Sequence, residues 1–526
     1  MQRALASLSV LLLLSCAAQP TKEQALVSRG IDALGGANAL AGIRTVAVKG
    51  SMKQWEPEQS DVPGGEMRFC NESSFETVSD RAARATRTDW VRNFAYPAPR
   101  TFTFSEIVTP EAGYILGIDS NSRNAQSLKT VPPAHSMSGL RLATAQRELK
   151  RLSPGALLLE MQANPQALQP ALDVVAEGRI YKAASYGGFT VAFDAQSGLP
   201  AIIRTLDYDN VWGDVTYDLR LSDWREVDGV KVAMAQKHEL NGRALIETHL
   251  TEVRFNAPVD AARFQAPESI RAGAAKPATG NVPWQWVIRR QFIGLYLDSD
   301  NTSYDLRGSP GLRLQDIAPG VSLVQGGTHN SLVVEMSDHL IVVDAPIGDA
   351  QSAWLLKAAQ EKYPGKPVRW LVLTHHHMDH TGGVRGLLLG GKTTLVVGQG
   401  AAAHWRRVLS APTSRNPDLP ARDFGMVPIV EVPESHVMAD DRGRQVIVYH
   451  LDNPHAKGML IAWVPDARLG FVADLWSPGT PLPPKPNPAL LSLVSAVKKA
   501  GIHPERFAGG HGSVAPYQQL TQLVGP

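Results

Sequence analysis

Residues 374–383 contain a dense set of possible metal ligands: His375, His377, Asp379 and His380 lie within six residues. They follow directly on the apolar run 370–373, which is typical of a buried strand, so the ligands would lie where that strand ends. Neutral imidazoles and a carboxylate are the donors that a borderline cation such as zinc prefers, and one loop can direct them at two adjacent ions. A solvated histidine-rich turn would need neither the aspartate nor the strand. The pattern therefore predicts a metal site.

Three further donors occur later in the chain, each beside a predicted strand or helix. His455 follows the strand-like run 446–449, and Asp474 follows the run 469–473 directly. His511 lies in a glycine-rich loop after a predicted helix over 488–500. Strands of an α/β sandwich end at a common edge, where their last side chains can meet. We therefore expect these donors to join the loop ligands in a site for two ions.

Asp344, the segment 375–380, His455, Asp474 and His511 follow one another along the chain. This order of residues resembles that of the metallo-β-lactamase-fold hydrolases, and the resemblance covers about residues 312–526. The resemblance implies a C-terminal αββα sandwich. It also implies a first zinc on His375, His377 and His455, a second zinc on Asp379, His380 and His511, and Asp474 as the bridge between them. Asp344, which follows a predicted strand, would brace the histidine loop without touching metal.

The chemistry implied by this resemblance is hydrolysis by a hydroxide that bridges two ions. Two cations that share a water lower its pKa from about 15.7 toward ~7, and they polarise the scissile carbonyl or phosphoryl oxygen. Asp379 would orient that hydroxide and pass on a proton, besides ligating. We expect two Zn²⁺ ions, with iron or manganese as alternatives.

The residue at position 474 separates branches of the family. β-Lactamases of this fold usually carry Cys or Ser there, whereas Asp is typical of thioesterases, lactonases and phosphodiesterases. We therefore expect a small-molecule ester, lactone or amide as the substrate. Four alternatives stay open: β-lactamase-like activity, phosphodiesterase activity, a persulfide-dioxygenase-like oxidoreductase with one iron, and an envelope protein without enzymatic activity whose β domain carries a lipid.

Other polar residues are weaker candidates. On an extended loop His376 should point away from its two neighbours, since alternate side chains face opposite sides. His329 lies after two glycines on a loop that could approach the substrate. We interpret His404 as structural. Arg385 and Lys457 either bind an anionic substrate group or are solvated surface charges.

The elements that must position the metal ligands alternate between strands and helices. Apolar runs at 321–324, 331–335 and 340–344 predict successive strands, and 349–362 predicts a helix with Trp354, Leu355 and Ala358 on one face. Pro364 and Gly365 end this helix before the strand that leads to the histidines. This alternation predicts an α/β layered core.

The first half of the chain has a different pattern. Short β segments fill residues 45–264, and Asp228-Gly229 and Asn241-Gly242 predict tight hairpin turns. Helices are expected over 22–40, with a break at Gly35-Gly36, and over 140–152, continuing beyond Pro154. This mainly antiparallel pattern over residues 22–268 is similar to that of the periplasmic lipoprotein-carrier half-barrels. Such a domain could bind a ligand or only brace the second domain.

The length of 526 residues exceeds one ordinary hydrophobic core. We expect a signal segment and lipobox over 1–16, a half-barrel-like β domain over 22–268 and the hydrolase domain over 312–526. Residues 269–311 would form a linker and lead-in, because 271–282 are small and turn-rich.

Composition and the N-terminus bear on partners and location. The formal net charge is +2 and no run of Lys and Arg occurs, so we expect no nucleic-acid partner. Arg3, the apolar run 4–14 and Cys16 resemble a bacterial lipoprotein signal, with ordinary cleavage as the alternative. We therefore expect export to the periplasm and anchoring at the outer membrane through lipidated Cys16. Cys70 would remain as a single cysteine, so no internal disulfide is expected. The sequence leaves the oligomeric state open.

Overall fold

The computed structural model of the chain describes residues 19–120, 134–271, 274–279, 284–292, 298, 312–327, 329–416, 419 and 423–525. The expected signal segment with Cys16 lies outside these residues, as does most of the expected lead-in up to Gly311. In the described part of the chain, every helix is too short or too polar to span a bilayer.

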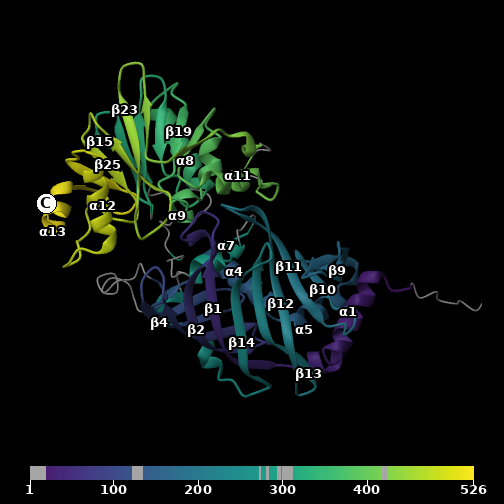
Figure 1. Cartoon of the computed structure of the whole chain (residues 1–526). Helices are drawn as coiled ribbons and strands as arrows, with labels where there is room; N and C mark the ends of the chain where they lie inside the picture. Colours follow the sequence, from purple (N-terminus) through teal and green to yellow (C-terminus); the bar gives the residue numbers. More distant parts are fainter. Residues whose placement is uncertain are drawn as a thin grey trace, which may run out of the picture.

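The first half of the chain forms one large antiparallel sheet. Its described strands are β1 Thr45–Glu56, β2 Arg68–Asp80, β3 Ala85–Phe94, β4 Arg100–Val108, β5 Gly113–Gly117, β6 Ala134–Ser136, β7 Gln169–Pro170, β8 Val174–Ala176, β9 Arg179–Tyr186, β10 Phe189–Phe193, β11 Pro200–Asp209, β12 Gly213–Val227, β13 Val230–Leu240 and β14 Arg243–Phe255. Among them the order runs from β6 back to β1, then through β14 down to β9 and β7, so the path stays open. The curved sheet in Figure 1 confirms the expected mainly antiparallel, half-barrel-like domain.

Local sequence accounts for the hairpins of this sheet. Asp228 and Gly229 join β12 to β13 with φ of 49° and 78°, and Asn241 and Gly242 join β13 to β14 with φ of 50° and 79°. Both positions of such a turn need positive φ, which Asn, Asp and Gly tolerate best. The predicted turns therefore occur where the sequence places them.

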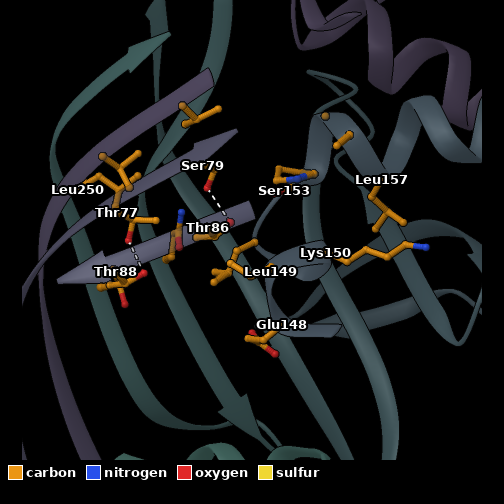
Figure 2. Close-up of a pocket in the computed structure, with 18 of the residues that line it drawn as sticks. Thr77, Ser79, Thr86, Thr88, Glu148, Leu149, Lys150, Ser153, Leu157 and Leu250 are labelled. Carbon is orange, nitrogen blue, oxygen red and sulfur yellow. Dashed lines mark hydrogen bonds between the residues drawn. The ribbon is translucent and has the colours of Figure 1, made fainter. Parts of the chain in front are cut away.

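Helices cover part of the sheet and leave a cavity against it. The described helices of this half are α1 Lys22–Ala33, α2 Ala37–Ala41, η1 Pro57–Gln59, α4 Gly139–Arg151, α5 Pro154–Ala163, η2 Pro165–Ala167, η3 Ala261–Phe264, α6 Glu268–Arg271 and α7 Trp284–Phe292. The cavity of about 890 Å³ lies between the sheet and α4 and α5. Figure 2 shows its wall, where Thr77 pairs with Thr88 and Ser79 with Thr86, opposite Leu149 and Leu157.

The second half of the chain is a sandwich of two sheets. The described strands of the second sheet are β15 Arg313–Ala318, β16 Val321–Gln325, β17 Ser331–Glu335, β18 Leu340–Val343, β19 Val368–Val372, β20 Thr394–Gly398 and β21 Ile429–Val432. Those of the third sheet are β22 Ser435–Ala439, β23 Gln445–Leu451, β24 Met459–Val464, β25 Leu469–Val472, β26 Arg506–Gly509 and β27 Val514–Pro516. The pairs β18–β19, β19–β20, β20–β21 and β25–β26 are parallel.

Helices lie on both outer faces of this sandwich. They are α8 Asp349–Lys362, α9 Met378–Thr381, α10 Val384–Leu388, α11 Ala402–Ser410, η4 Phe424–Met426, α12 Pro488–Lys499 and α13 Tyr517–Val524. One apolar core fills the space between the sheets, with Leu323 and Val334 facing Val448 and Phe471. Helices α8, α10 and α11 bury the outer face of the second sheet, and α12 and α13 bury that of the third. These four layers confirm the expected αββα fold.

Helix α7 lies between the half-barrel and the sandwich (Figure 1). Its Trp286 and Val287 belong to the core that α8 and α11 share, whereas Ile288 and Phe292 belong to the core of the half-barrel. A nine-residue helix with apolar contacts on both sides joins the two halves by burial.

Candidate metal centre

The possible ligands of the histidine-rich segment meet at one edge of the sandwich. β19 ends at Val372, the loop after it carries His375 and His377, and α9 presents Asp379 and His380. Strand ends and loops bring four more side chains to this edge: Asp344 after β18, His455 between β23 and β24, Asp474 after β25 and His511 after β26. The structure therefore gathers all seven predicted metal ligands, together with Asp344.

Asp474 lies at the centre of this set. Its Oδ1 is 2.9 Å from His380 Nε2 and 2.7 Å from His511 Nε2. Its Oδ2 is 2.8 Å from His455 Nε2 and 3.3 Å from His375 Nε2. Each carboxylate oxygen thus faces a different pair of imidazoles, which is the arrangement expected of a carboxylate shared by two cations.

His375, His377 and His455 form the first group with Asp474, and their ligand atoms lie within 4.8 Å of one another. His377 Nδ1 is 3.0 Å from His455 Nε2. His375 Nε2 is buried and faces Asp474 Oδ2 at 3.3 Å, without the geometry of a hydrogen bond. Nitrogens that converge on one point beside a carboxylate oxygen fit a bound cation.

A second group contains Asp379, His380 and His511 together with His329, again within 4.8 Å. His329 Nε2 is 3.1 Å from Asp379 Oδ2. From the sequence, His329 is expected only to approach the substrate, and the two glycines before it are the one signal. The structure places it among the possible ligands, because the loop after β16 folds over α9.

Asp344 has the geometry of a bracing residue. Its carboxylate accepts hydrogen bonds from Thr374 N at 2.7 Å and Thr374 Oγ1 at 2.9 Å, and it lies 3.0 Å from His380 Nδ1. A carboxylate that accepts from Nδ1 fixes the tautomer of the ring. It therefore leaves His380 Nε2 facing Asp474.

Burial sets the protonation of the imidazoles. It lowers the pKa of His375 to about 3 and that of His329 to about 4, so both rings are neutral and carry a lone pair at pH 7. Burial also acts on His380, but the carboxylates of Asp474, Asp344 and Asp379 outweigh it and hold its pKa well above the usual value. The site thus combines neutral donors with carboxylates that favour positive charge, and this donor set fits divalent cations.

Two residues of the half-barrel also reach this centre, through the connection between β1 and β2. Gln59 Nε2 donates to Asp379 Oδ1 at 2.9 Å, and the Ser60 carbonyl lies 3.0 Å from His377 Nε2. No sequence motif marks residues 56–61, because their part in the centre depends on how the two halves dock.

The other histidines considered from sequence lie outside both groups. His376 Nε2 is 2.8 Å from the Ser60 carbonyl, and His376 belongs to neither ligand group. His404 is buried against the Trp212 ring, with 5.5 Å between ring centroids. Both therefore support packing between the halves of the chain.

Arg385 corrects one expectation. We expected either a substrate contact or a solvated charge, but the side chain is fully buried. Its guanidinium donates to the carbonyls of Asn210, at 3.0 Å, and Val408, at 2.5 Å. Arg385 thus joins α10 to the half-barrel. Lys457, in contrast, is exposed, in agreement with its interpretation as a solvated surface charge.

A third group of possible ligands lies in the half-barrel. Asp119, His135 and Asp298 have ligand atoms within 4.8 Å of one another. Arg141 Nη1 lies 2.6 Å from both carboxylates. The guanidinium already supplies the positive charge that this acidic group requires.

Comparison with known proteins identifies a family for the sandwich. The family model of the metallo-beta-lactamase superfamily matches residues 324–514. Among curated proteins, none matches the sequence.

Several solved structures are similar to part of the chain. The Flv1 flavodiiron core from Synechocystis sp. PCC6803 is 14% identical, with a TM-score of 0.32, over 40% of this chain and 59% of its own. The sec-alkylsulfatase Pisa1 from Pseudomonas sp. is 17% identical, with a TM-score of 0.31, over 40% of each chain. The metallo-beta-lactamase FIM-1 from Pseudomonas aeruginosa, in its mono-zinc form, is 18% identical, with a TM-score of 0.31, over 41% of this chain and 95% of its own.

This chain spans only 59% and 40% of the length of the first two relatives, so the match concerns one domain. The family match runs from the last two residues of β16 to the first residue of β27, and it includes every residue of the two ligand groups. The C-terminal sandwich of this chain therefore belongs to the metallo-beta-lactamase superfamily.

Proposed function

We propose that this chain is an exported metal-dependent hydrolase that holds two zinc ions and cleaves an ester, lactone or amide bond. The observation that carries the proposal is the position of Asp474, whose two oxygens face different groups of imidazoles at 2.7–3.3 Å. One carboxylate between two donor sets supports two cations in one centre. A single-iron oxidoreductase would need only one of these sets.

Each group of residues would have its own role in hydrolysis. Two cations on the two groups would supply Lewis acidity and activate a water. Asp379 would orient the water and receive its proton, because one of its oxygens faces the second group. His375, His377 and His380 are fully shielded, whereas the side chains of Asp379, His455 and His511 are 20%, 19% and 31% exposed. Substrate would therefore approach from the exposed side of the centre.

Export is the part of the proposal that rests on sequence. The apolar run 4–14 and Cys16 support a lipoprotein signal. Lipidated Cys16 would hold the domain at the periplasmic side of the outer membrane. Mass spectrometry of the protein from the membrane fraction should find a diacylglyceryl or triacyl modification on Cys16, and an unmodified N-terminus would contradict anchoring.

The test of the enzymatic proposal is metal analysis combined with a substrate panel. Purified protein should contain two zinc ions per chain and hydrolyse members of an ester, lactone and amide panel. β-Lactams and phosphodiesters belong in the same panel, because activity on either alone would redirect the substrate assignment. One iron per chain with oxygen consumption on a persulfide would instead support the oxidoreductase. Full activity after complete removal of metal would refute the proposal.

The cavity favours a second function for the half-barrel, the binding of an apolar molecule. Its walls are mainly aliphatic and aromatic, and four of its hydroxyls pair across β2 and β3, Thr77 with Thr88 and Ser79 with Thr86. Polar groups that satisfy each other leave a surface suited to an apolar ligand. A fluorescent fatty acid should bind, and Thr88→Trp, which fills the cavity, should weaken binding. Thr251→Trp, at an exposed position, is the control; equal binding by all three proteins would count against a ligand here.

A further inference from the structure

The first residues of the connection between β1 and β2, 57–60, are buried, whereas Asp61 and Val62 after them are exposed. Glu58, Gln59 and Ser60 are 3%, 4% and 0% exposed. The sandwich covers them: Asp61 O accepts a hydrogen bond from Lys457 N at 2.8 Å. The buried residues 57–60 therefore pack against the sandwich, at the edge that carries the metal groups.

The Gln59 amide has one possible orientation. The Asp379 carboxylate only accepts hydrogen bonds, so Gln59 Nε2 must face it, and the distance is 2.9 Å. Gln59 Oε1 then faces the Tyr96 hydroxyl, which donates to it at 2.5 Å. The Tyr96 ring is held in turn by the Arg68 guanidinium, 4.6 Å from the ring centroid, and Arg68 Nε donates to the Gln59 carbonyl at 2.5 Å. The side chain of Gln59 is therefore fixed at both ends.

This contact decides how Asp379 can bind a cation. Gln59 holds Oδ1, while Oδ2 faces His329 Nε2 at 3.1 Å in the second group. One oxygen is engaged by the half-barrel, and the other remains for the cation. Partners that hold the second atom of a ligand commonly set its orientation and the metal affinity.

Ser60 acts in the same way on the first group. Its carbonyl accepts a hydrogen bond from His377 Nε2 at 3.0 Å. The ring must then carry its proton on Nε2, so Nδ1 presents the lone pair, 3.0 Å from His455 Nε2. The same carbonyl lies 2.8 Å from His376 Nε2, which keeps it in place.

We propose that residues 59 and 60 of the half-barrel are positioning residues of the metal centre. Gln59 orients the Asp379 carboxylate in the second group, and the Ser60 carbonyl fixes the tautomer of His377 in the first. The centre is thus complete only when the two halves of the chain are docked. This inference rests on the proposed function, because it requires that the two groups bind cations.

The test is a titration of metal-free full-length protein with Zn²⁺ and Co²⁺ against a chromophoric chelator. Gln59→Leu keeps the size of the side chain and removes both hydrogen bonds. It should weaken one of the two binding steps by about 10–100-fold, the usual effect of losing a partner that orients a ligand, and leave the other step unchanged. Tyr96→Phe keeps the ring beside Arg68 and removes only the hydroxyl, so the same step should shift by less.

Gln54→Leu is the matched control. Gln54 is a buried amide on β1, the strand that leads to Gln59, and it bonds to Asn71 and to the Arg289 carbonyl, away from the metal groups. It should lower thermal stability without moving either binding step. Excess metal should restore hydrolysis by Gln59→Leu with an unchanged KM, since the substrate contacts remain.

The outcomes separate this inference from the proposed function. If the wild-type protein binds no metal, both fail. If it binds two ions and Gln59→Leu and Tyr96→Phe bind them with unchanged affinity, only this inference fails. A loss of affinity in Gln54→Leu equal to that in Gln59→Leu would also overturn it, because the effect would then come from docking alone.

Discussion

Two aspartates of the metal centre have an unusual backbone conformation. Asp344 and Asp474 have φ of 65° and 53°; Asp344 follows β18 directly, and Asp474 is the second residue after β25. Positive φ is uncommon outside glycine and is tolerated where surrounding contacts fix it. Here the turn directs each carboxylate back across the strand end, toward the histidines.

Asp474→Asn should remove the shared carboxylate while keeping its size. Because each oxygen faces one group, we expect fewer than two bound ions and a loss of hydrolysis of at least about 100-fold, since even indirect partners cost 10–100-fold. Metal counting and steady-state kinetics measure this. Asp441→Asn, at an exposed turn, should change neither; a fully active Asp474→Asn with two ions would exclude the bridging role.

Asp344→Asn tests the bracing role separately from ligation. The amide would place a donor or a single acceptor against Thr374 N, Thr374 Oγ1 and His380 Nδ1, so at least one buried group loses its partner. We expect a destabilisation of about 1–3 kcal/mol and weaker binding of the cation that His380 holds. Denaturant unfolding with metal titration measures both, and an unchanged unfolding midpoint would contradict the assignment.

At the scale of elements, α7 and η1 share a buried set of charges. Arg289 and Arg290 face Glu56, Glu58 and Asp209, and the five side chains are at most 1% exposed. Two guanidiniums and three carboxylates would leave one negative charge. Burial raises the pKa of Glu58 to about 8, so a proton on Glu58 balances the set at pH 7.

This proton makes stability depend on pH. In the unfolded chain Glu58 titrates near 4.5 and in the folded chain near 8, so between these values folding takes up a proton. The contribution is complete below about pH 4.5 and is lost as pH rises through 8. At about 1.4 kcal/mol per pKa unit it is on the order of 3–5 kcal/mol. Melting curves from pH 5 to 8.5 should show the wild-type protein losing stability relative to Glu58→Gln, and parallel curves would contradict the assignment.

In the whole molecule, the half-barrel and the sandwich share an interface. Val211 of the half-barrel and Trp286 of α7 lie in the same apolar core as α8 and α11 of the sandwich. Asn210 Nδ2 donates to Ile347 O at 2.9 Å, and Tyr208 Oη to Asp349 Oδ2 at 2.9 Å. The interface is therefore both apolar and hydrogen-bonded.

Arg289→Met should uncouple the halves. It leaves Glu56 and Asp209 buried without their main counter-charge, and breaking such a pair costs about 3–5 kcal/mol. Calorimetry should show one transition for the wild-type protein and two for the variant. Arg225→Ala removes an exposed ion pair with Asp223, 65% and 48% exposed, and should cost less than about 1 kcal/mol. A single, unshifted transition for Arg289→Met would show that the charges do not hold the interface.

Much of the fold follows from local sequence. The hairpins at Asp228 and Asn241 and the helix Asp349–Lys362 occur as predicted, because turn chemistry and apolar periodicity act over a few residues. The candidate ligands could likewise be named in advance, since strand ends are visible as apolar runs and only 15 of the 526 residues are histidines.

The amino-acid sequence is enough to name the residues that could form a metal centre and the type of fold that carries them. Only the tertiary structure decided that His329 joins the second group, that Arg385 is buried, and that Gln59 and Ser60 complete the centre. Each of these depends on contacts between segments that are far apart along the chain. Such contacts cannot be predicted from local sequence patterns, because the contacts form only where distant segments of the folded chain pack together.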